Sequence, residues 1–440
     1  MKREGRTPAF TFYGDDFTGS TDALEALASN GVPSVLFLEM PDAARLREFA
    51  HVEAIGIAGE SRSRSPEWMS AHLPAIFKKL RSLKAPICQY KVCSTFDSAP
   101  GVGSIGRALE IGKDVFGASF VPIVPAAPHL KRYVFFSHLF AGDHAGVHRI
   151  DRHPTMSQHP VTPMAESDLR VHLGRQTTGR LKSLDTLALD SLDADSHLDA
   201  VVEDKPIGVI FDGASREALR RTAALIWKRR AEACFVVGSS GFTHGLAVYW
   251  RSIGLLKTMD EFARPEPVQK MIVMAGSRSP ATERQIRWAV ANGFEGIRLD
   301  TAALSNGQGA NPARAAVQKT ALAHLEAGRS VVLHTAFGKD IGKDPAQREE
   351  LAVQMGKLLH TLVARSGVKR ALIAGGDTAS HAGRQLGVYA LTMLAPMAPG
   401  APLCRAHSED PHSRGLELVF KGGQIGPDDF FGAVRAGACG

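Results

Sequence analysis

The sequence predicts an α/β protein of two domains, each a mostly parallel sheet flanked by helices. Short apolar runs of strand length alternate with amphipathic helical stretches along the whole chain. Several of these runs end in loops rich in Gly, Ser, Thr or Asp just before a helix, at the edge where open α/β sheets bind ligands. A chain of 440 residues also exceeds one compact domain. We place the domains at residues 1–256 and 268–440, with a proline- and charge-rich linker near 255–270.

Charge, cysteine content and hydrophobicity argue against a nucleic-acid-binding, disulfide-bonded or membrane protein. The formal charge of +7 is spread over scattered basic residues without a Lys/Arg run interleaved with aromatics, which favours a small anionic substrate over nucleic acid. The five cysteines are odd in number and form no CxxC pair, as expected for reduced thiols in a cytoplasmic protein. The N-terminal stretch has no hydrophobic signal core and no apolar run is long enough to span a bilayer, so we expect no membrane partner.

The first predicted strand-to-helix unit spans residues 9–27. An apolar and aromatic strand ends at Gly14, the adjacent carboxylates Asp15 and Asp16 follow, and a helix with three early hydroxyl residues runs to Asn30-Gly31. The acids could simply cap the helix and offset its dipole. One aspartate would suffice for capping, and two neighbouring carboxylates repel each other, so we favour a functional role.

Further strands are predicted at residues 35–38, 54–58 and 87–92. The loop at 59–64 carries Arg62 and Arg64 and is either a solvated loop or a cationic wall for an acid. The loop at 93–107 follows Lys91 and is rich in hydroxyls and glycine, whose backbone N–H groups can approach an anion closely.

Histidines gather between residues 138 and 163, after a strand at 121–124. His144 and His148 have the i,i+4 spacing that could hold a metal on a helix. The Gly and Pro content argues against a helix there, so polar contacts with an oxygen-rich substrate are favoured. Thr162 followed by proline predicts the start of a helix that runs through Leu173. Two more strands follow at 206–212 and 234–237.

The second half restarts the α/β pattern. Strands at 271–274, 330–334, 370–374 and 416–420 are predicted, and three of them leave through Gly- or Ser-rich loops at 275–280, 375–380 and 421–426. Three such turns at strand ends predict a nucleotide cradle. Neither a Walker sequence nor a G-x-G-x-x-G after a strand is present, so the cradle is neither a P-loop nor a dinucleotide-binding Rossmann site.

Together these segments resemble the four-carbon acid sugar kinases, formerly a domain family of unknown function, over nearly the whole chain. The segment at 91–98, KVCSTFDS, has the form found in 3-oxo-tetronate kinases. Two positions depart from the family: Gly103-Ser104 stands where G-N is common, and Asp377 stands where Glu is frequent. The first departure leaves 3-oxo-isoapionate kinase open as an alternative. The other matching segments are 15–19, 125–128, 159–164, 276–279, 375–378 and 421–426.

The resemblance implies an N-terminal acid-sugar domain and a C-terminal nucleotide domain, with ATP in the cleft between them. Its nucleotide-binding residues would be Ser277, Gly375, Gly376, Asp377, Thr378, Gly422 and Gly423. The implied activity is ATP-dependent phosphorylation of a small acid sugar in carbohydrate-acid catabolism.

Phosphoryl transfer needs positioning and charge neutralisation more than covalent chemistry. A base must accept the hydroxyl proton, and we expect Asp16 in this role, with Asp97 as the alternative. Mg²⁺ needs only one or two protein carboxylates, for which Asp15 or Asp377 could serve, so the metal ligands stay open. The expected substrate-binding residues are Asp15, Arg62, Lys91, Ser94, Thr95, Ser98, Gly103 and His159.

Two functions from other classes remain. A phosphatase of the haloacid-dehalogenase kind has the motif D-x-D-x-[TV], but here the acids are adjacent rather than alternating. A non-catalytic sugar-acid-binding protein would leave the three glycine loops of the second half without a purpose. The sequence does not fix the number of subunits, and a homo-oligomer is compatible with it.

Overall fold

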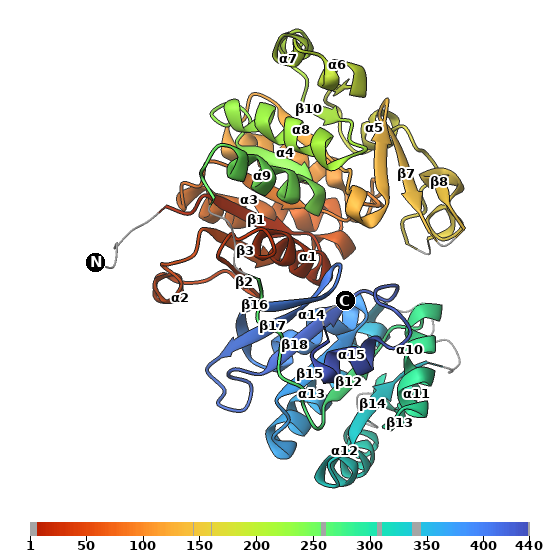
Figure 1. Ribbon diagram of the computed structural model, residues 1–440. Helices are drawn as coiled ribbons and strands as arrows, with labels where there is room; N and C mark the ends of the chain where they lie inside the picture. The colour runs from red at the N-terminus through yellow and green to blue at the C-terminus, as the bar shows by residue number, and fades with distance from the viewer. Residues whose placement is uncertain are drawn as a thin grey trace. The chain divides into compact units, whose positions relative to one another are not determined.

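The computed structural model describes residues 7–143, 145–159, 161–256, 261–305, 310–336 and 345–438. The chain divides into two compact units (Figure 1). Unit 1 comprises Met1–Ser34 and Met40–Asp260, and unit 2 comprises Val35–Glu39 and Glu261–Gly440. A short segment of the first half, most of strand β2 (Ser34–Phe37), therefore belongs to unit 2.

Unit 1 contains a parallel sheet of seven strands in the order β3-β1-β4-β11-β5-β10-β9. Most of its strands are buried along their whole length, as expected for a parallel sheet covered by helices on both faces. Because β1 lies between β3 and β4, the loops that leave these three strands meet at one edge. The strands are β1 (Phe10–Gly14), β3 (Ala54–Ala58), β4 (Cys88–Lys91), β5 (Val121–Val124), β9 (Leu181–Leu184), β10 (Gly208–Phe211) and β11 (Phe235–Gly238).

The helices of unit 1 form two packed groups. Helix α9 (Ser240–Ser252) packs against α1 (Phe17–Ala28) and α8 (Arg216–Lys228), while α3 (Pro66–Ser82) packs against α4 (Ile105–Phe116) (Figure 1). Each of these helices begins at a Ser or Asp whose side chain accepts a hydrogen bond from a backbone N–H of the first turn. A separate antiparallel sheet joins β6 (Arg132–Phe135), β7 (His138–Gly142) and β8 (Val147–Arg149). The shorter helices are α2 (Ala43–Glu48), α5 (Leu169–Gly174), α6 (Thr186–Asp190) and α7 (Ala194–Glu203).

The helix predicted from Thr162 through Leu173 is wrong at its start. Helix α5 begins at Leu169, after the N-cap Asp168. The Thr162 hydroxyl does not cap a helix, because it donates a hydrogen bond to Asp97 at 3.1 Å. Of the two histidines with i,i+4 spacing, His148 lies on β8 and contacts Asp143, while His144 lies outside the described residues.

Unit 2 contains a mixed sheet in the order β13-β14-β12-β15-β18-β17-β16-β2. The first five strands are parallel, and the last three are antiparallel. The sequence analysis did not predict β13 or the long hairpin of β16 and β17. The strands are β12 (Ile272–Ala275), β13 (Phe294–Arg298), β14 (Ser330–His334), β15 (Arg370–Ala374), β16 (Val388–Ala398), β17 (Ala401–Ser408) and β18 (Glu417–Lys421).

Helices and a continuous apolar core complete unit 2. The core joins sheet residues such as Val273 and Val332 to Phe430 and Phe431 of the last helix. The helices are α10 (Pro280–Ala291), α11 (Thr301–Ser305), α12 (Ala310–Glu326), α13 (Pro345–Ser366), α14 (Gly376–Gln385) and α15 (Phe430–Ala436). Each unit thus has a largely parallel sheet flanked by helices, which confirms the predicted fold class. The expected location of the active site between the domains stays a prediction.

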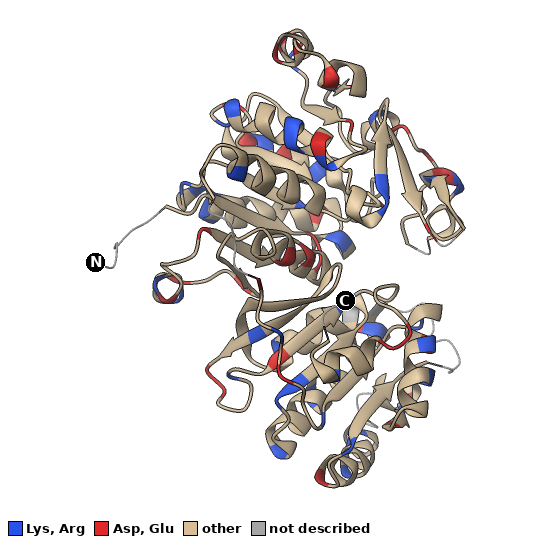
Figure 2. Cartoon of the chain, viewed as in Figure 1, with Lys and Arg blue, Asp and Glu red and all other residues tan. Residues whose placement is uncertain are grey.

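Two surface properties bear on partners. Basic and acidic residues are interspersed on the elements of both units in the view of Figure 2, as the scattered charges of the sequence predicted. Among the helices that the structure describes, none is both long and apolar enough to cross a bilayer.

Candidate active site

Asp16 is the N-cap of α1. Its Oδ1 accepts the backbone N–H of Gly19 at 2.7 Å, and its Oδ2 accepts the hydroxyl of Thr18 at 3.1 Å. The guanidinium of Arg62 lies 3.5 Å from the same Oδ2. The capping role that the sequence analysis ranked second is therefore present, and the role of Asp16 as a base stays a prediction.

Asp97 is held by a set of donors from three segments. Arg62 donates to both of its oxygens at 2.8 and 2.6 Å, Thr95 donates at 2.5 Å and Thr162 at 3.1 Å. Burial alone would raise the pKa of Asp97, but Arg62 and the Thr95 hydroxyl outweigh it and hold the pKa at about 2. Asp97 is therefore ionised at neutral pH, and both of its oxygens already accept hydrogen bonds from these side chains.

Asp15 has few partners. Asp15 is 4% exposed, and its Oδ1 has no hydrogen-bond partner among the described residues. Burial is the largest cause that raises the pKa of Asp15, to about 7, and the neighbouring Asp16 adds to it against the opposing charges of Arg62 and Lys91. A carboxyl group whose pKa lies near 7 and whose oxygen is unpaired is typical of a functional site.

Lys91, expected to bind substrate, is neutralised inside unit 1. Its side chain is 1% exposed, and its ammonium lies 3.0 Å from the Asp22 carboxylate. Burial raises the pKa of Asp22, but Lys91 and then His129 overcome this and lower it. The sequence analysis missed Asp22; the available signal was an acidic residue between buried positions of α1.

Of the remaining predicted residues of unit 1, His159 contacts the aspartate cluster and Ser98 does not. His159 reaches the aspartate cluster, because its Nδ1 accepts the N–H of Thr162, whose hydroxyl binds Asp97. Ser98 points elsewhere, since it contacts His172 and Gln176, which contributes its amide at 2.9 Å. Ser94 is buried in the same loop.

Gly103 packs closely against the backbone of Arg62. It has a φ of +59°, and a Cβ added there would lie 2.4 Å from the carbonyl oxygen of Arg62. Phe96, in the loop that carries Asp97, also has a positive φ of 57° although it is bulky and fully buried. Such a conformation is rare outside glycine and concentrates at functional sites, where the surrounding structure holds the strain.

Unit 2 brings its three predicted loops into contact. A Cβ added to Gly276 would lie 1.9 Å from the Thr378 hydroxyl oxygen, and one added to Gly423 would lie 2.5 Å from that of Ser277. Gly375 has a φ of +118°, and a Cβ there would lie 3.0 Å from the Ser277 nitrogen. All three loops therefore approach one another as closely as glycine allows. Gly376 begins α14, and of Asp377 only the backbone is described.

Backbone donors gather at this edge of the sheet. The first-turn N–H groups of α14 have no carbonyl partner within the helix. In the turn after β18, the N–H groups of Gly422, Gly423 and Gln424 also donate to no acceptor among the described residues. Unpaired N–H groups at a helix start and at a glycine turn are suited to binding phosphate.

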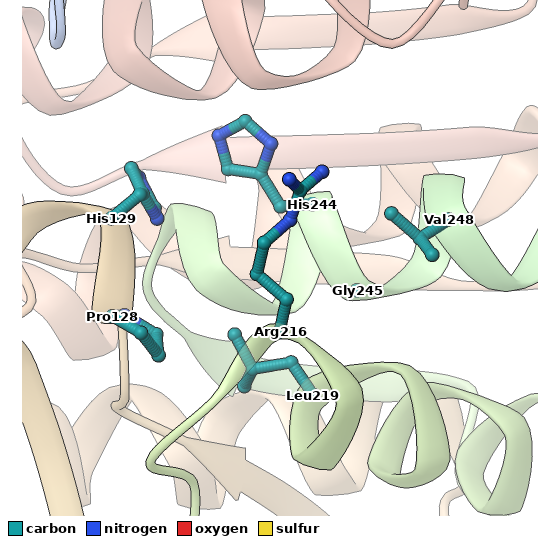
Figure 3. Close-up of a pocket in the computed structure, with 7 residues that line it drawn as sticks. All are labelled: Pro128, His129, Arg216, Leu219, His244, Gly245 and Val248. Atoms are coloured by element: carbon teal, nitrogen blue, oxygen red, sulfur yellow. The ribbon is translucent and has the colours of Figure 1, made fainter.

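A separate pocket lies in unit 1 beside helices α8 and α9 (Figure 3). Asn30 contacts the Nδ1 atom of His244 at 2.9 Å, and the ring of His244 meets that of His129 edge-on with centroids 4.4 Å apart. The lining residues, none of which was predicted as a site residue, are Pro128, His129, Arg216, Leu219, His244, Gly245 and Val248. In the part of the chain that the structure describes, no three His, Cys, Asp or Glu side chains gather as a metal site.

Comparison with known proteins identifies both halves of the chain. Residues 10–246 match the family model of a sugar-binding N-terminal domain, and residues 272–431 match that of a nucleotide-binding C-terminal domain. The chain is 44% identical to a 3-oxo-isoapionate kinase from Paraburkholderia graminis, over 97% of this chain and 94% of that protein. It is 30% identical to a 3-oxo-tetronate kinase from Cupriavidus necator, over 96% of each.

Solved structures agree on the fold. The crystal structure of a putative tRNA synthase from Salmonella typhimurium LT2 matches with a TM-score of 0.77 at 22% identity, over 96% of this chain and 97% of that one. At that identity the match speaks for the fold alone. The two relatives in sequence are both named kinases, which leaves the phosphatase and binding-protein alternatives without support. The resemblance seen in the sequence is confirmed: the chain belongs to the four-carbon acid sugar kinase family and is an ATP-dependent sugar-acid kinase.

Proposed function

We propose that this enzyme transfers the terminal phosphoryl group of ATP to a hydroxyl group of 3-oxo-isoapionate. The observation that carries the choice of acid is the 44% identity to a 3-oxo-isoapionate kinase over nearly the full length of both chains. The departure from the common family sequence is at Ser104, which caps α4 and follows Gly103, the residue packed against the Arg62 carbonyl oxygen.

The second candidate substrate is 3-oxo-tetronate. The segment KVCSTFDS at 91–98 has the form found in 3-oxo-tetronate kinases, and a relative of that name shares 30% of its residues with this chain. The two acids therefore have to be compared on the same enzyme.

The acid would bind at the edge of unit 1 where β1, β3 and β4 end. Arg62 is the cation best placed for its carboxylate, since its side chain stays 26% exposed while it holds Asp97. Lys91 would contribute only from a distance, because Asp22 already neutralises it. Thr95 and His159 would complete the polar wall around Asp97.

Among the three aspartates, Asp15 is best suited to be the general base. Asp16 and Asp97 already accept hydrogen bonds from Gly19, Thr18, Arg62, Thr95 and Thr162. Asp15 keeps an unpaired oxygen, and its pKa of about 7 suits a base that must be ionised yet able to take a proton near neutral pH. This revises the expectation that Asp16 serves as the base, and the three variants below decide between them.

ATP would lie against the three loops of unit 2, through Ser277, the start of α14 and the turn at Gly422-Gly423. Mg²⁺ would travel with the phosphates, since it commonly needs only one or two protein carboxylates. Asp377 is the candidate ligand by its place in the nucleotide loop, because Asp15 is assigned the role of base. The ion would neutralise phosphate charge. The four free cysteines of the described chain suit the cytoplasm, and a homo-oligomer stays a prediction.

The test is a coupled ADP-release assay with the purified enzyme, ATP, Mg²⁺ and each acid in turn. We expect kcat/KM to be at least tenfold higher for 3-oxo-isoapionate than for 3-oxo-tetronate, a difference of about 1.4 kcal/mol in transition-state binding. Equal or reversed values would overturn the choice of acid. The control is the same assay without acid, because ADP release that persists there reflects ATP hydrolysis rather than phosphoryl transfer.

A further inference from the structure

We propose that Lys421 is a positioning residue of the nucleotide site: it holds the Gly422–Gln424 turn in its phosphate-binding shape and takes up a proton when a nucleotide binds. The proposal rests on nucleotide binding by unit 2. It goes beyond that role by naming a buried group that senses the charge of the ligand.

Lys421 is the last residue of β18 and is 0% exposed. Lys91 is also almost fully buried, but it has Asp22 as a partner at 3.0 Å. Among the described residues, no carboxylate forms an ion pair with Lys421; its ammonium instead lies 3.0 Å from the Thr282 hydroxyl and 3.4 Å from the Gly423 carbonyl oxygen. A buried ammonium without a counter-charge is costly, so its presence here calls for a reason other than stability.

The ammonium belongs to a cluster that fixes one carbonyl group. The Gly423 oxygen accepts the hydroxyls of Ser279 and of Thr282, the latter at 2.9 Å, in addition to the contact with Lys421. In a trans peptide the carbonyl and the next N–H point in opposite directions. Tying the Gly423 oxygen to this cluster therefore turns the N–H of Gln424 away from it, toward the side left open for an anion.

Among the side chains that the structure describes, the charged groups of the surrounding elements form no ion pair with Lys421. On the sheet, Arg370 and Glu417 pair with each other at the other end of β15 and β18. On α10, Arg284 pairs with Asp428, and Glu283 forms no bond with Lys421. The other titratable side chains that the structure describes in the loop at 275–280, in α10 and in α14 are His381 and three arginines with interactions of their own, Arg278, Arg287 and Arg384.

Burial alone lowers the pKa of Lys421, to about 7. The lysine is then largely neutral at pH 8 in the free protein. A polyphosphate at the adjoining turn would supply the missing negative charge and favour the ammonium form. Nucleotide binding would therefore draw a proton from solvent, and affinity would rise as the pH falls toward 7.

The experiment is calorimetry of ADP binding at pH 8 in two buffers with different enthalpies of ionisation. At this pH the phosphates are fully ionised, since their second pKa is about 6, so they contribute little proton uptake. We expect the wild-type protein to take up more than half a proton per ADP bound. Lys421→Met and Lys421→Gln should take up almost none and should bind ADP at least tenfold more weakly. Lys369→Met, which changes an exposed lysine of the same unit, should behave as wild type.

Two outcomes overturn the proposal: uptake near zero in the wild-type protein at pH 8, or undiminished uptake in a folded Lys421 variant. Should both variants fail to fold, the wild-type measurement repeated from pH 6.5 to 9.5 decides. A maximum of uptake between the free and bound pKa values supports the proposal, and a flat profile at zero refutes it. Failure of ADP to bind at all would instead contradict the nucleotide site itself.

Discussion

The two sheet edges that we propose as ligand sites differ in the chemical groups that they carry. In unit 1 the edge carries paired charges: Arg62 holds Asp97 at 2.6 Å, and Asp22 holds Lys91 at 3.0 Å. In unit 2 the edge consists of backbone N–H groups and hydroxyls, with a single buried ammonium at Lys421. The cations Arg62 and Lys91 of the first edge are thus already paired without a ligand, whereas the second edge has donors in excess.

This difference follows from the ligands. A small acid brings one carboxylate and a hydroxyl that must lose a proton, so its site needs an oriented cation and a poised base. The Arg62–Asp97 pair fixes the orientation of the cation, and Asp15 is left as the unsatisfied acid. A triphosphate brings several charges, which many weak donors can share. The contrast predicts that substitutions in unit 1 affect turnover and stability strongly, while those in unit 2 affect mainly nucleotide affinity.

The largest expected effect is on turnover in Asp15→Asn. Loss of a general base lowers kcat by about 10²–10⁴-fold, while KM for the acid changes little. The wild-type pH profile of kcat should rise through pH 7, because Asp15 must be ionised, and the variant should lack this rise. Steady-state kinetics from pH 5.5 to 9 make the measurement.

Asp16→Asn and Asp97→Asn serve as the matched controls. Asparagine caps a helix about as well as aspartate, so Asp16→Asn should keep most of its turnover and lose little stability. A loss of kcat in Asp16→Asn with near-normal turnover in Asp15→Asn would restore Asp16 as the base. A loss confined to Asp97→Asn would assign the role to Asp97.

The second effect is on stability in Arg62→Met. Removing the guanidinium leaves Asp97 buried and charged, which costs about 3–5 kcal/mol for a broken buried pair. Denaturant unfolding of the wild type and the variant measures this cost. The double variant Arg62→Met/Asp97→Asn should recover part of it, because the buried charge is gone. A single variant as stable as the wild type would mean that Asp97 is not buried as a charge.

The third effect is the pH dependence contributed by Asp15. The pKa of Asp15 is about 7 in the folded protein, whereas its ordinary value, which applies to the unfolded chain, is 3.8. Between pH 3.8 and pH 7 the folded state therefore binds more protons than the unfolded state. Stability from this group is therefore present below pH 4 and is lost as the pH rises through 7, by on the order of 4 kcal/mol. Asp15→Asn should remove the loss and be more stable than wild type at pH 8 but not at pH 4. Chemical denaturation at both pH values tests this, and equal differences at both would contradict it.

The sequence could predict the positions of both edges but not the partners within them. Strand ends and glycine turns are local patterns, and they placed the loops at 275–280, 375–380 and 421–426 at strand ends, where the structure brings them into contact. The Lys91–Asp22 and Arg62–Asp97 pairs depend on which strands are neighbours, and no local pattern reveals the order β3-β1-β4. The same holds for Thr162, whose Thr-Pro sequence indicated a helix cap, while a non-local contact with Asp97 decides its role. The β16–β17 hairpin was missed because its strands are far longer than the others and carry no Gly-rich exit loop into a helix.

The smallest effect is on ATP affinity in Gly376→Val. Apart from its chain neighbours and the backbone of its own helix, no atom of the described residues lies within 4 Å of a Cβ added to Gly376, so we expect a side chain to fit at the start of α14 without strain. Gly375→Ala is the contrasting variant, since its φ of +118° disfavours any side chain and the fold itself should suffer. We expect Gly376→Val to melt at the wild-type temperature and to bind ATP about tenfold more weakly, which corresponds to about 1.4 kcal/mol. Binding of the acid should not change, because its proposed site lies in unit 1. Unchanged ATP affinity in the folded variant would remove the start of α14 from the nucleotide site, and a parallel loss of acid affinity would show that the two edges do not act independently.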